Sequence, residues 1–455
     1  MNNGDHNIPE NYIKTICDEA MSEYRLGERH VAQDAIKRGL RNADGTGVLI
    51  GETGIGSVRG YYMEDGSRVP MPGELYYRGI SVSDIIDSHQ RNRTFGFEEV
   101  AYLLLLGKLP NATQNEFFNM ILSRARKLPD GFIEDILLKH PGKNIMNMLS
   151  RCVLALYTYD DRAEDESVEN LMRQSIELIG RFPAIVATAY AIKRHRFDEK
   201  SLYIHSPKEQ LSVPENFLRM LRKDKVYTKE EALLLDLMLI LHAEHGGGNN
   251  STFTCRTLSS ARTDTYSAIS GAINSLKGAL HGGANAKVIE MLEFIKSEVK
   301  DTDNENEVSA YLDKLLDKKA GDRSGKIFGL GHAVYTISDP RAEIIKKYAR
   351  AMAEEKGRLR DFLFIETVER LGLQKIAERK KLDIPMCANV DLYSGFVYAT
   401  LGIPEELYTP LFALARIAGW CAHRLEEVIT CDRIMRPAYR ASVKKHPYAQ
   451  PEERL

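Results

Sequence analysis

Apolar positions recur at helical spacing along most of this chain. Residues 97–106 (FEEVAYLLLL) place two acids in a first turn ahead of an apolar face, which predicts a helix. Residues 232–241 are apolar nearly all round and follow a capping-box pattern at Thr228–Glu231, so we expect a helix in the core. Small and apolar residues within 268–280 recur at i, i+3 and i+4, which predicts a closely packed helix that ends at His281.

The N-terminal part of the chain shows two other sequence patterns. Residues 9–42 are rich in Glu, Lys, Arg and Ala, which predicts a helical extension over residues 1–44. From Gly45 to about Gly79, short β-prone pieces alternate with Gly, Asp and Pro, which predicts a small patch of strands and turns. Helical patterning then continues almost to the end. The predicted fold class is therefore mainly α, with a small β patch near the N-terminus.

Composition and charge narrow the class of protein further. The 455 residues are 43% hydrophobic and 28% charged, which is ordinary for a soluble globular protein of two or three domains. Lys and Arg number 62 and Asp and Glu 64, for a net charge of −2. This balance provides no general attraction to nucleic acid or to an anionic membrane, so an anionic ligand must be held by local cations.

Cysteine usage and the chain's start favour a cytoplasmic protein. The six cysteines include no CxxC pair, which is typical of scattered reduced thiols. The first residues have neither a basic region nor an apolar core of a signal peptide. The most apolar run, Ala232–Leu241, is interrupted by Asp236 and is far shorter than the roughly 20 residues of a membrane span. We expect no membrane and no nucleic-acid partner.

Four histidines lie in Gly-rich or otherwise unusual contexts. His242 and His245 occur in LHAEHGGGNNST, His281 in KGALHGGANAKV and His332 in FGLGHAVYTISDPR. Flanking glycines allow a ligand to approach the backbone closely and place the side chain at the end of an element. One such histidine is more often structural, but three separate Gly-flanked histidines indicate a functional site.

Several familiar motifs do not hold in this chain. His245 begins an HGGG sequence like the oxyanion loop of esterases, but no GxSxG nucleophile elbow occurs. The i, i+3 pair His242 and His245 lacks an HExxH context and an evident carboxylate ligand, so we expect no metal. Gly54 and Gly56 start an incomplete dinucleotide fingerprint with no helix after it, which indicates turn chemistry.

Asp391 lies among apolar and small residues, beside Asn389 in CANVDLYSG. An acid in such a segment either caps a helix start or acts as a base with a perturbed pKa. Composition alone favours the cap. Desolvation raises the pKa of a carboxyl group and would suit a general base if a substrate binds there.

Five motifs follow one another in the order seen in citrate synthases: LHAEHGGGN, GALHGGAN, GLGHAV…DPR, NVDLYSG and FALARIAGWCAHRLEE. Upstream, ELYYRG and FEEVAYLLLLGKLP are also similar, so that the chain resembles this family from about residue 45 to about residue 437. The resemblance implies a two-domain helical fold in a homodimer or a higher assembly. The large domain would comprise residues 45–285 and 398–455, the small domain residues 286–397, and the active site would lie in the cleft between them.

The resemblance also implies roles for individual residues. The family condenses an acyl-CoA with a 2-oxo acid and then hydrolyses the thioester, chemistry that needs a base and hydrogen-bond donors for developing charge. By motif, Asp391 resembles the base and His281 the donor to the thioester oxygen. His332 resembles the acid that polarises the 2-oxo carbonyl, and His245 a further ligand of the 2-oxo acid.

Three arginines match the clamps for a dicarboxylate, a task that suits the bidentate guanidinium. They are Arg341 of the DPR motif, Arg416, and Arg436, which the family contributes from the partner subunit. Family members often carry Lys or Arg, which can meet a CoA phosphate, where this chain has Thr336. The residues that align with CoA contacts are Leu280, Ile327, Phe328, Gly329, Leu330, Gly331, Ala333 and Asn389.

The function implied by the resemblance is the conversion of oxaloacetate, acetyl-CoA and water into citrate and CoA, with acyl-CoA as a co-substrate and no permanently bound cofactor. The near alternative is a 2-methylcitrate synthase acting on propionyl-CoA, since one methylene changes discrimination by only about 1–3 kcal/mol. More distant alternatives are an HGGG-type ester hydrolase and an inactive relative that serves as a helical binding protein.

Overall fold

The computed structural model describes residues 36–42, 44–381 and 384–439, together with a few isolated positions near the two ends. The chain divides into two units: residues 53–435, and residues 1–52 with 436–455. Most of the helix predicted over residues 9–42 lies outside the described residues. Its described end is a turn of 3₁₀ helix, η2 (Arg38–Leu40), followed by a β-bridge between Arg41 and Gly47.

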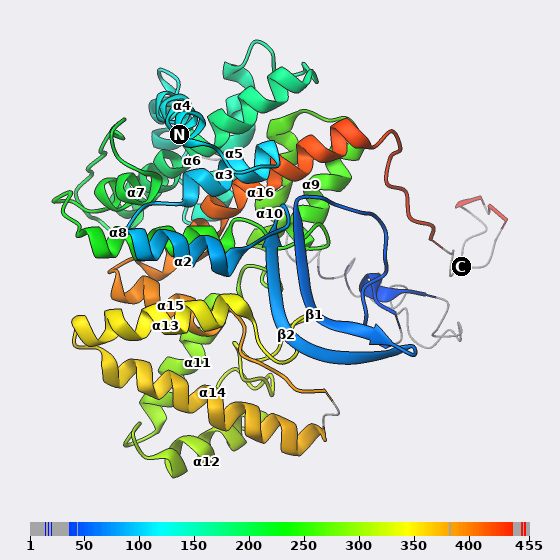
Figure 1. Cartoon of the computed structure of the whole chain (residues 1–455), viewed down its shortest axis with the longest axis vertical. Helices are drawn as coiled ribbons and strands as arrows, with labels where there is room; N and C mark the ends of the chain where they lie inside the picture. The colour runs from blue at the N-terminus through cyan, green and yellow to red at the C-terminus, as the bar shows by residue number, and fades with distance from the viewer. Residues whose placement is uncertain are drawn as a thin grey trace. The chain divides into compact units, whose positions relative to one another are not determined.

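The larger unit is mainly α, as the sequence predicts (Figure 1). Its strands are β1 (Gly56–Glu64), β2 (Ser67–Tyr77) and β3 (Ile80–Ser81). Its α-helices are α2 (Val82–Asn92), α3 (Phe97–Leu106), α4 (Ala112–Arg124), α5 (Ile145–Leu156), α6 (Val168–Phe197), α7 (Val213–Leu221), α8 (Lys229–His242), α9 (Asn250–Ser260), α10 (Thr265–Lys277), α11 (Ala284–Glu298), α12 (Glu305–Leu316), α13 (Pro340–Glu355), α14 (Leu359–Lys380), α15 (Asp391–Thr400) and α16 (Tyr408–Thr430). Short segments are the π-helix η3 (Ile133–Leu138) and the 3₁₀ helices η4 (Tyr157–Tyr159) and η5 (Glu405–Leu407).

Helix α16 forms the centre of the core. It packs against α3, α6, α8, α9 and α10 (Figure 1). Trp420 on this helix is fully buried. The predicted core helix is α8, which is buried on all sides from Ala232 onward. Its capping box is present, because Thr228 Oγ1 accepts the N–H of Glu231 and Glu231 Oε2 accepts that of Thr228, both at 3.1 Å. Helix α8 therefore leads into the segment of His245, and α16 carries Arg416.

The helix expected to end at His281 stops earlier. Helix α10 ends at Lys277, and the chain then turns, with the N–H of Gly282 donating to Leu276 O at 2.9 Å. A Cβ at Gly282 would stand 2.2 Å from that carbonyl oxygen, so only glycine fits the turn. Consequently Leu280, which the pattern assigned to the packed face, is fully exposed.

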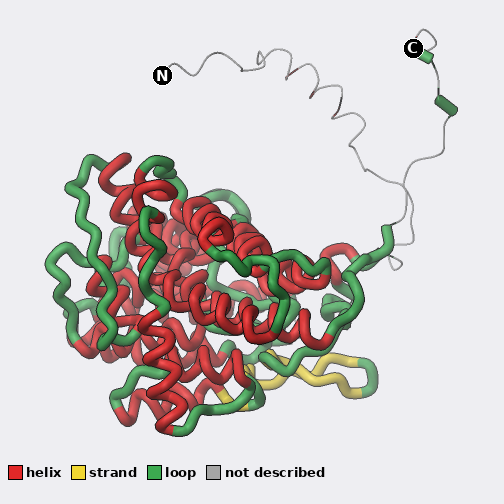
Figure 2. Tube along the Cα trace, turned by 90° about the horizontal axis from the view of Figure 1, so that it is seen from above, coloured by secondary structure: helices red, strands yellow, loops and turns green. Residues whose placement is uncertain are grey.

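The predicted β patch is a three-stranded antiparallel sheet in the order β1-β2-β3. Residues pair from Gly56 with Tyr77 to Arg59 with Glu74, and the register then shifts, so that Tyr61 opposes Pro70. Four residue steps on β2 therefore match two on β1, which makes a bulge in the hairpin. Figure 2 shows this hairpin at one side of the helical body.

Helix α6 is, among the described residues, the one helix long and apolar enough to cross a membrane by length and composition alone. Buried positions make up 83% of its most apolar window. The core helix of a globular protein passes the same test, so this is weak evidence for a membrane span.

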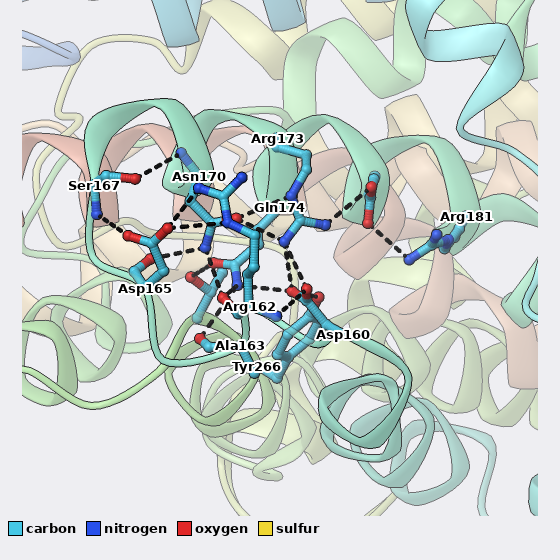
Figure 3. A network of polar contacts seen from close by, with 12 residues as sticks. Asp160, Arg162, Ala163, Asp165, Ser167, Asn170, Arg173, Gln174, Arg181 and Tyr266 are labelled. Atoms are coloured by element: carbon cyan, nitrogen blue, oxygen red, sulfur yellow. Dashed lines mark hydrogen bonds and ion pairs between the residues drawn. The ribbon is translucent and has the colours of Figure 1, made fainter.

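A polar network holds the start of α6 (Figure 3). The carboxylate of Asp160 accepts hydrogen bonds from Arg173 at 2.7 Å, from Gln174 at 2.9 Å and from the hydroxyl of Tyr266 at 2.7 Å. Burial alone would raise the pKa of Asp160, but these donors hold it at about 2. Since Tyr266 lies on α10, the network joins the loop before α6 to both helices.

Helices α11 to α15 pack mainly against one another, with α13 and α15 in contact, and α12 with α14. They lie almost entirely within the predicted small domain, residues 286–397. The boundaries of that domain stay a prediction.

Candidate functional site

A cavity of about 140 Å³ gathers most of the predicted site residues. Its lining contains His242, His245, His281, His332, Arg341, Asn389 and Asp391, with Asn249, Gly282, Asn285, Val390, Tyr398, Tyr408, Thr409 and Phe412. The three predicted catalytic residues thus come together from positions up to 110 residues apart in the sequence. The cavity lies within the larger unit.

The backbone fixes His332 and Asp391 relative to each other. The N–H of Asn389 donates to Gly329 O, and the Asn389 amide donates to Gly331 O, both at 2.8 Å. Gly329 and Gly331 have φ of 85° and 92°, a region that favours glycine. The Gly-rich segment before His332 is therefore bound to the segment that leads into α15.

Asp391 is the first residue of α15 and does not act as its cap. Its N–H instead donates to Asn389 Oδ1 at 3.0 Å, so the interpretation that composition favoured is wrong. The carboxyl group of Asp391 is enclosed deeply enough that desolvation raises its pKa to about 6. The negative charge of Asp339 adds to this rise in pKa, and Arg341 opposes it.

The hydrogen bonds of His332 define its tautomer. Nδ1 accepts the backbone N–H groups of Val334 and Tyr335, both at 3.1 Å. A neutral imidazole with an accepting Nδ1 carries its proton on Nε2, which makes Nε2 a donor. The ring stacks on Tyr335 with centroids 4.6 Å apart and meets His245 edge-on at 5.2 Å.

His281 has the opposite tautomer. Its Nε2 accepts the backbone N–H of Ser251 at 3.3 Å and lies 3.1 Å from the Ser251 hydroxyl. That hydroxyl accepts the indole N–H of Trp420 at 3.2 Å. Burial, with a contribution from Arg416, lowers the pKa of His281 to about 4, so the ring is neutral near pH 7 and carries its proton on Nδ1.

Arg416 is fully buried with only part of its guanidinium satisfied. Nε donates to His242 O at 2.6 Å, whereas Nη1 and Nη2 find no hydrogen-bond partner in the described part of the chain. Burial lowers the pKa of Arg416 to about 10, and the nearby charge of Glu244 opposes this shift. Leaving a buried charge unpaired is costly, so the two nitrogens mark a place for an anionic ligand.

Arg341 is paired within its own motif. Its Nε and Nη2 donate to the two carboxylate oxygens of Asp339 at 3.0 and 2.7 Å, and both residues are buried. Burial alone would lower the pKa of Arg341, but Asp339 raises it above its ordinary value. The sequence identified Arg341 in DPR but did not reveal that the Asp of the same motif is its counter-ion.

The two histidines at the end of α8 are both neutral. Burial lowers the pKa of His242 to about 3, and burial together with Arg341 lowers that of His245 well below its ordinary value. His242 Nδ1 donates to Met238 O at 2.7 Å, while His245 Nε2 is buried and has no hydrogen-bond partner among the described residues. His245 therefore presents an unsatisfied ring nitrogen.

Sequence reasoning missed a buried carboxylate between these histidines. Glu244 Oε1 accepts the ring N–H of His423 at 2.9 Å and the N–H of Gly246 at 2.5 Å. His423 Nδ1 in turn accepts from Arg256 at 3.0 Å. The only signal for this contact was the Glu inside LHAEHGGG, because His423 lies on α16 and Arg256, which donates to His423, lies on α9.

The residues aligned with CoA contacts differ in how far they are exposed to solvent. Leu280 and Ala333 are exposed, whereas Ile327 and Gly329 are buried and Phe328, Leu330, Gly331 and Asn389 are partly buried. Thr336 is also buried, so its position offers no phosphate contact in this structure. Arg436 is exposed and belongs to the smaller unit, and its role across a dimer stays a prediction.

Activity is expected to be independent of a metal ion. The described residues contain no group of three or more His, Cys, Asp or Glu side chains that would hold an ion, and the histidine pair at the end of α8 lacks a third ligand. Turnover measured with and without EDTA should agree. Loss of turnover that zinc restores would contradict this expectation.

Known proteins match this chain over most of its length. A family model described as citrate synthase, C-terminal domain, matches residues 43–438. The citrate synthase of Deinococcus radiodurans is 37% identical over 341 residues, which cover 75% of this chain and 84% of that protein. The 2-methylcitrate synthase 1 of Corynebacterium glutamicum is 32% identical over 378 residues, covering 82% of this chain and 91% of that protein.

Solved structures agree with the sequence comparison. A ternary complex of citrate synthase from the archaeon Thermoplasma acidophilum with carboxymethyl coenzyme A and oxaloacetate has a TM-score of 0.74 and 28% sequence identity, covering 92% of this chain and 99% of that one. Fold and relatives define an enzyme of the acyl-transferring class. The chain belongs to the citrate synthase family, so the expectation of family and fold class is confirmed.

Proposed function

We propose that the protein is a cytoplasmic citrate synthase that condenses acetyl-CoA with oxaloacetate and hydrolyses citryl-CoA to citrate and CoA. The observation that carries the proposal is the set of groups around one cavity. A carboxyl with a raised pKa and two neutral histidines of opposite tautomer line it. The buried Arg416 donates to the backbone of His242 in this lining, and its Nη1 and Nη2 have no partner among the described residues. The Thermoplasma acidophilum enzyme, named as a complex with a CoA derivative and oxaloacetate, supports the substrate class.

In the proposed mechanism, Asp391 removes a proton from the methyl carbon of acetyl-CoA. The Nδ1–H of His281 donates to the thioester oxygen as negative charge develops there. The nucleophilic carbon then attacks the 2-oxo carbonyl of oxaloacetate, whose oxygen receives the Nε2 proton of His332. The proton that Asp391 has taken balances this loss, and its transfer to His332 through solvent restores both groups. Water finally cleaves the thioester bond of citryl-CoA, so that the thiol of CoA leaves and citrate forms. The chain's own residues supply the base and both donors.

The dicarboxylate needs cationic partners. Arg416 offers two buried cationic nitrogens without partners in the described residues. The neutral His245 adds a ring nitrogen, Nε2, that likewise has no partner there. Arg341 and His245 line the cavity, and Arg416 donates to the carbonyl of His242 in that lining. In a homodimer, the partner subunit's Arg436 would complete the clamp, as the family resemblance implies. The aligned segment 327–331, with Leu280, Ala333 and Asn389, would contact CoA.

Release of CoA tests the reaction directly. With oxaloacetate present, we expect kcat/KM for acetyl-CoA to exceed that for propionyl-CoA by roughly 10- to 200-fold, the range that one methylene can discriminate. The assay detects the thiol with each acyl-CoA at several concentrations. A preference for propionyl-CoA would assign the protein instead to 2-methylcitrate synthesis, the activity named for the Corynebacterium glutamicum relative. No CoA release with any 2-oxo acid would overturn both assignments.

A further inference from the structure

One end of the β1–β2 hairpin is bound to the segment that carries His245. The hydroxyl of Tyr77, the last residue of β2, donates to Ile240 O at 2.8 Å and lies 3.1 Å from Glu244 O, and its side chain is fully buried. At the opposing position on β1, a Cβ on Gly56 would stand 2.8 Å from the Glu244 side chain. This end of the hairpin is therefore packed closely against the end of α8.

The bulge of the same hairpin is bound to the segment between His332 and Arg341. The Thr336 hydroxyl donates to Gly60 O and also lies 3.3 Å from Met71 O, while the N–H of Gly73 donates to Ser338 Oγ at 3.1 Å. The hydroxyl of Thr336 is buried in this contact. Two site residues thus flank a segment that the hairpin holds by side-chain hydrogen bonds.

The backbones approach so closely that side chains are excluded. A Cβ on Gly60 would stand 2.5 Å from Val334 O, and one on Gly73 would stand 2.2 Å from Ser338 O and 2.7 Å from the Tyr335 ring. Contacts under 3.0 Å with backbone atoms cannot be relieved by a change of rotamer. The bulge places both glycines against the 334–338 segment, which explains why the pairing of β1 and β2 breaks there.

The contacted segment sets the donor state of His332. Its Nδ1 accepts the N–H groups of Val334 and Tyr335, and the Tyr335 ring stacks on the imidazole. A shift of the 334–335 backbone would therefore change both the direction of Nε2–H and the tautomer that carries it. The contacts with the hairpin therefore affect His332 through the backbone of residues 334–335.

We propose that the hairpin positions the 2-oxo acid half of the site, and that Thr336 is a positioning residue that holds His332 and Arg341 against the end of α8. The proposal rests on the function proposed above, in which these residues bind oxaloacetate. The buried hydroxyl of Thr336 suits this task, because it donates to Gly60 O on β1 and lies 3.3 Å from Met71 O on β2.

Thr336→Val tests the proposal, because valine keeps the shape and removes the hydroxyl. We expect KM for oxaloacetate to rise about three- to tenfold and kcat to fall, the scale of one lost buried hydrogen bond. KM for acetyl-CoA should change less than twofold. Thr336→Ser retains the hydroxyl and should restore KM for oxaloacetate to near the wild-type value. Thr265→Val, which removes a buried hydroxyl that donates to Gln174 Oε1 outside the cavity, serves as the matched control.

The outcomes separate the two proposals. A wild-type protein that releases no CoA would overturn the proposed function itself. If the wild type is active, an unchanged KM for oxaloacetate in Thr336→Val would overturn only the role of the hairpin. Equal rises in KM for oxaloacetate and for acetyl-CoA would overturn that role as well. So would equal losses of activity in Thr336→Val and Thr336→Ser. Should Thr336→Val not fold, Ser338→Ala removes the milder bond to Gly73, and a selective rise in KM for oxaloacetate is again expected, while no rise would contradict the proposal.

Discussion

Replacing Asp391 with asparagine is expected to lower kcat by about 10²- to 10⁴-fold. Asparagine keeps the shape of the side chain but cannot accept the proton that leaves the acyl carbon. The Asp391 carboxyl has its pKa raised to about 6 by burial, so it is ionised near neutral pH yet basic enough to take a proton. Steady-state CoA release with both substrates saturating measures the effect. Near-normal turnover of Asp391→Asn would show that another group is the base.

Thermal stability and the pH dependence of turnover serve as controls for Asp391→Asn. The pKa of Asp391 lies above its ordinary value of 3.8, so ionisation is harder in the folded state than in the unfolded one. The folded state therefore loses stability as pH rises from about 3.8 through about 6, and asparagine removes this cost. Thermal unfolding at pH 8 should give a Tm equal to or above that of the wild type. Wild-type kcat/KM should fall as pH drops below about 6, as Asp391 is protonated.

Replacing Arg416 with lysine is expected to raise KM for oxaloacetate by about 10- to 100-fold, the scale of hydrogen bonds to a charged group. Lysine keeps the positive charge near Glu244 but loses the planar fork that can bind a carboxylate through two nitrogens. In the present structure Nη1 and Nη2 of Arg416 are buried without partners in the described residues, so both are placed for a ligand. Initial rates at varied oxaloacetate and saturating acetyl-CoA give the value.

Arg424→Lys is the matched control on the same helix. Arg424 is also buried, but its guanidinium donates to Thr265, Ser259 and the carbonyl of Thr263. The guanidinium of Arg416 instead contacts two residues of the cavity lining, His242 through its carbonyl and Phe412 through its ring. Its substitution should lower Tm through those lost bonds while KM for oxaloacetate changes little. A normal KM for oxaloacetate in Arg416→Lys, or an equal rise in both variants, would remove Arg416 from the proposed clamp.

The local sequence pattern was enough to predict the helices that bury one continuous apolar surface. Helix α3 begins and ends where FEEVAYLLLL does, and the Thr228–Glu231 capping box starts α8 as expected. Both depend on neighbours within one or two turns, so the sequence holds all the information required. The same reasoning wrongly placed Leu280 on a packed helix face. The i, i+3 pattern continues to Leu280, although α10 has already ended and the chain turns from Gly278 to Gly282.

The ordered motifs likewise determined the family and brought the histidines and Asp391 forward as candidates. The sequence could not say whether Asp391 caps α15 or has a perturbed pKa, because these depend on Asn389 accepting its N–H and on desolvation by surrounding elements. Nor could it give the tautomers of His281 and His332. Backbone N–H groups set both tautomers: two donate to His332, and one, from Ser251 thirty residues away along the chain, donates to His281.

Only the tertiary structure decided what surrounds each charge. It paired Arg341 with Asp339, left two nitrogens of Arg416 without a partner in the described part of the chain, and buried Thr336 in the bulge of the hairpin. These outcomes depend on which polar groups remain within about 3 Å once water is excluded, a property of packed elements that no periodicity in the sequence encodes. The sequence by itself determined the helices and the chemical types of residue at the site, while packing determined their protonation, their partners and their geometry.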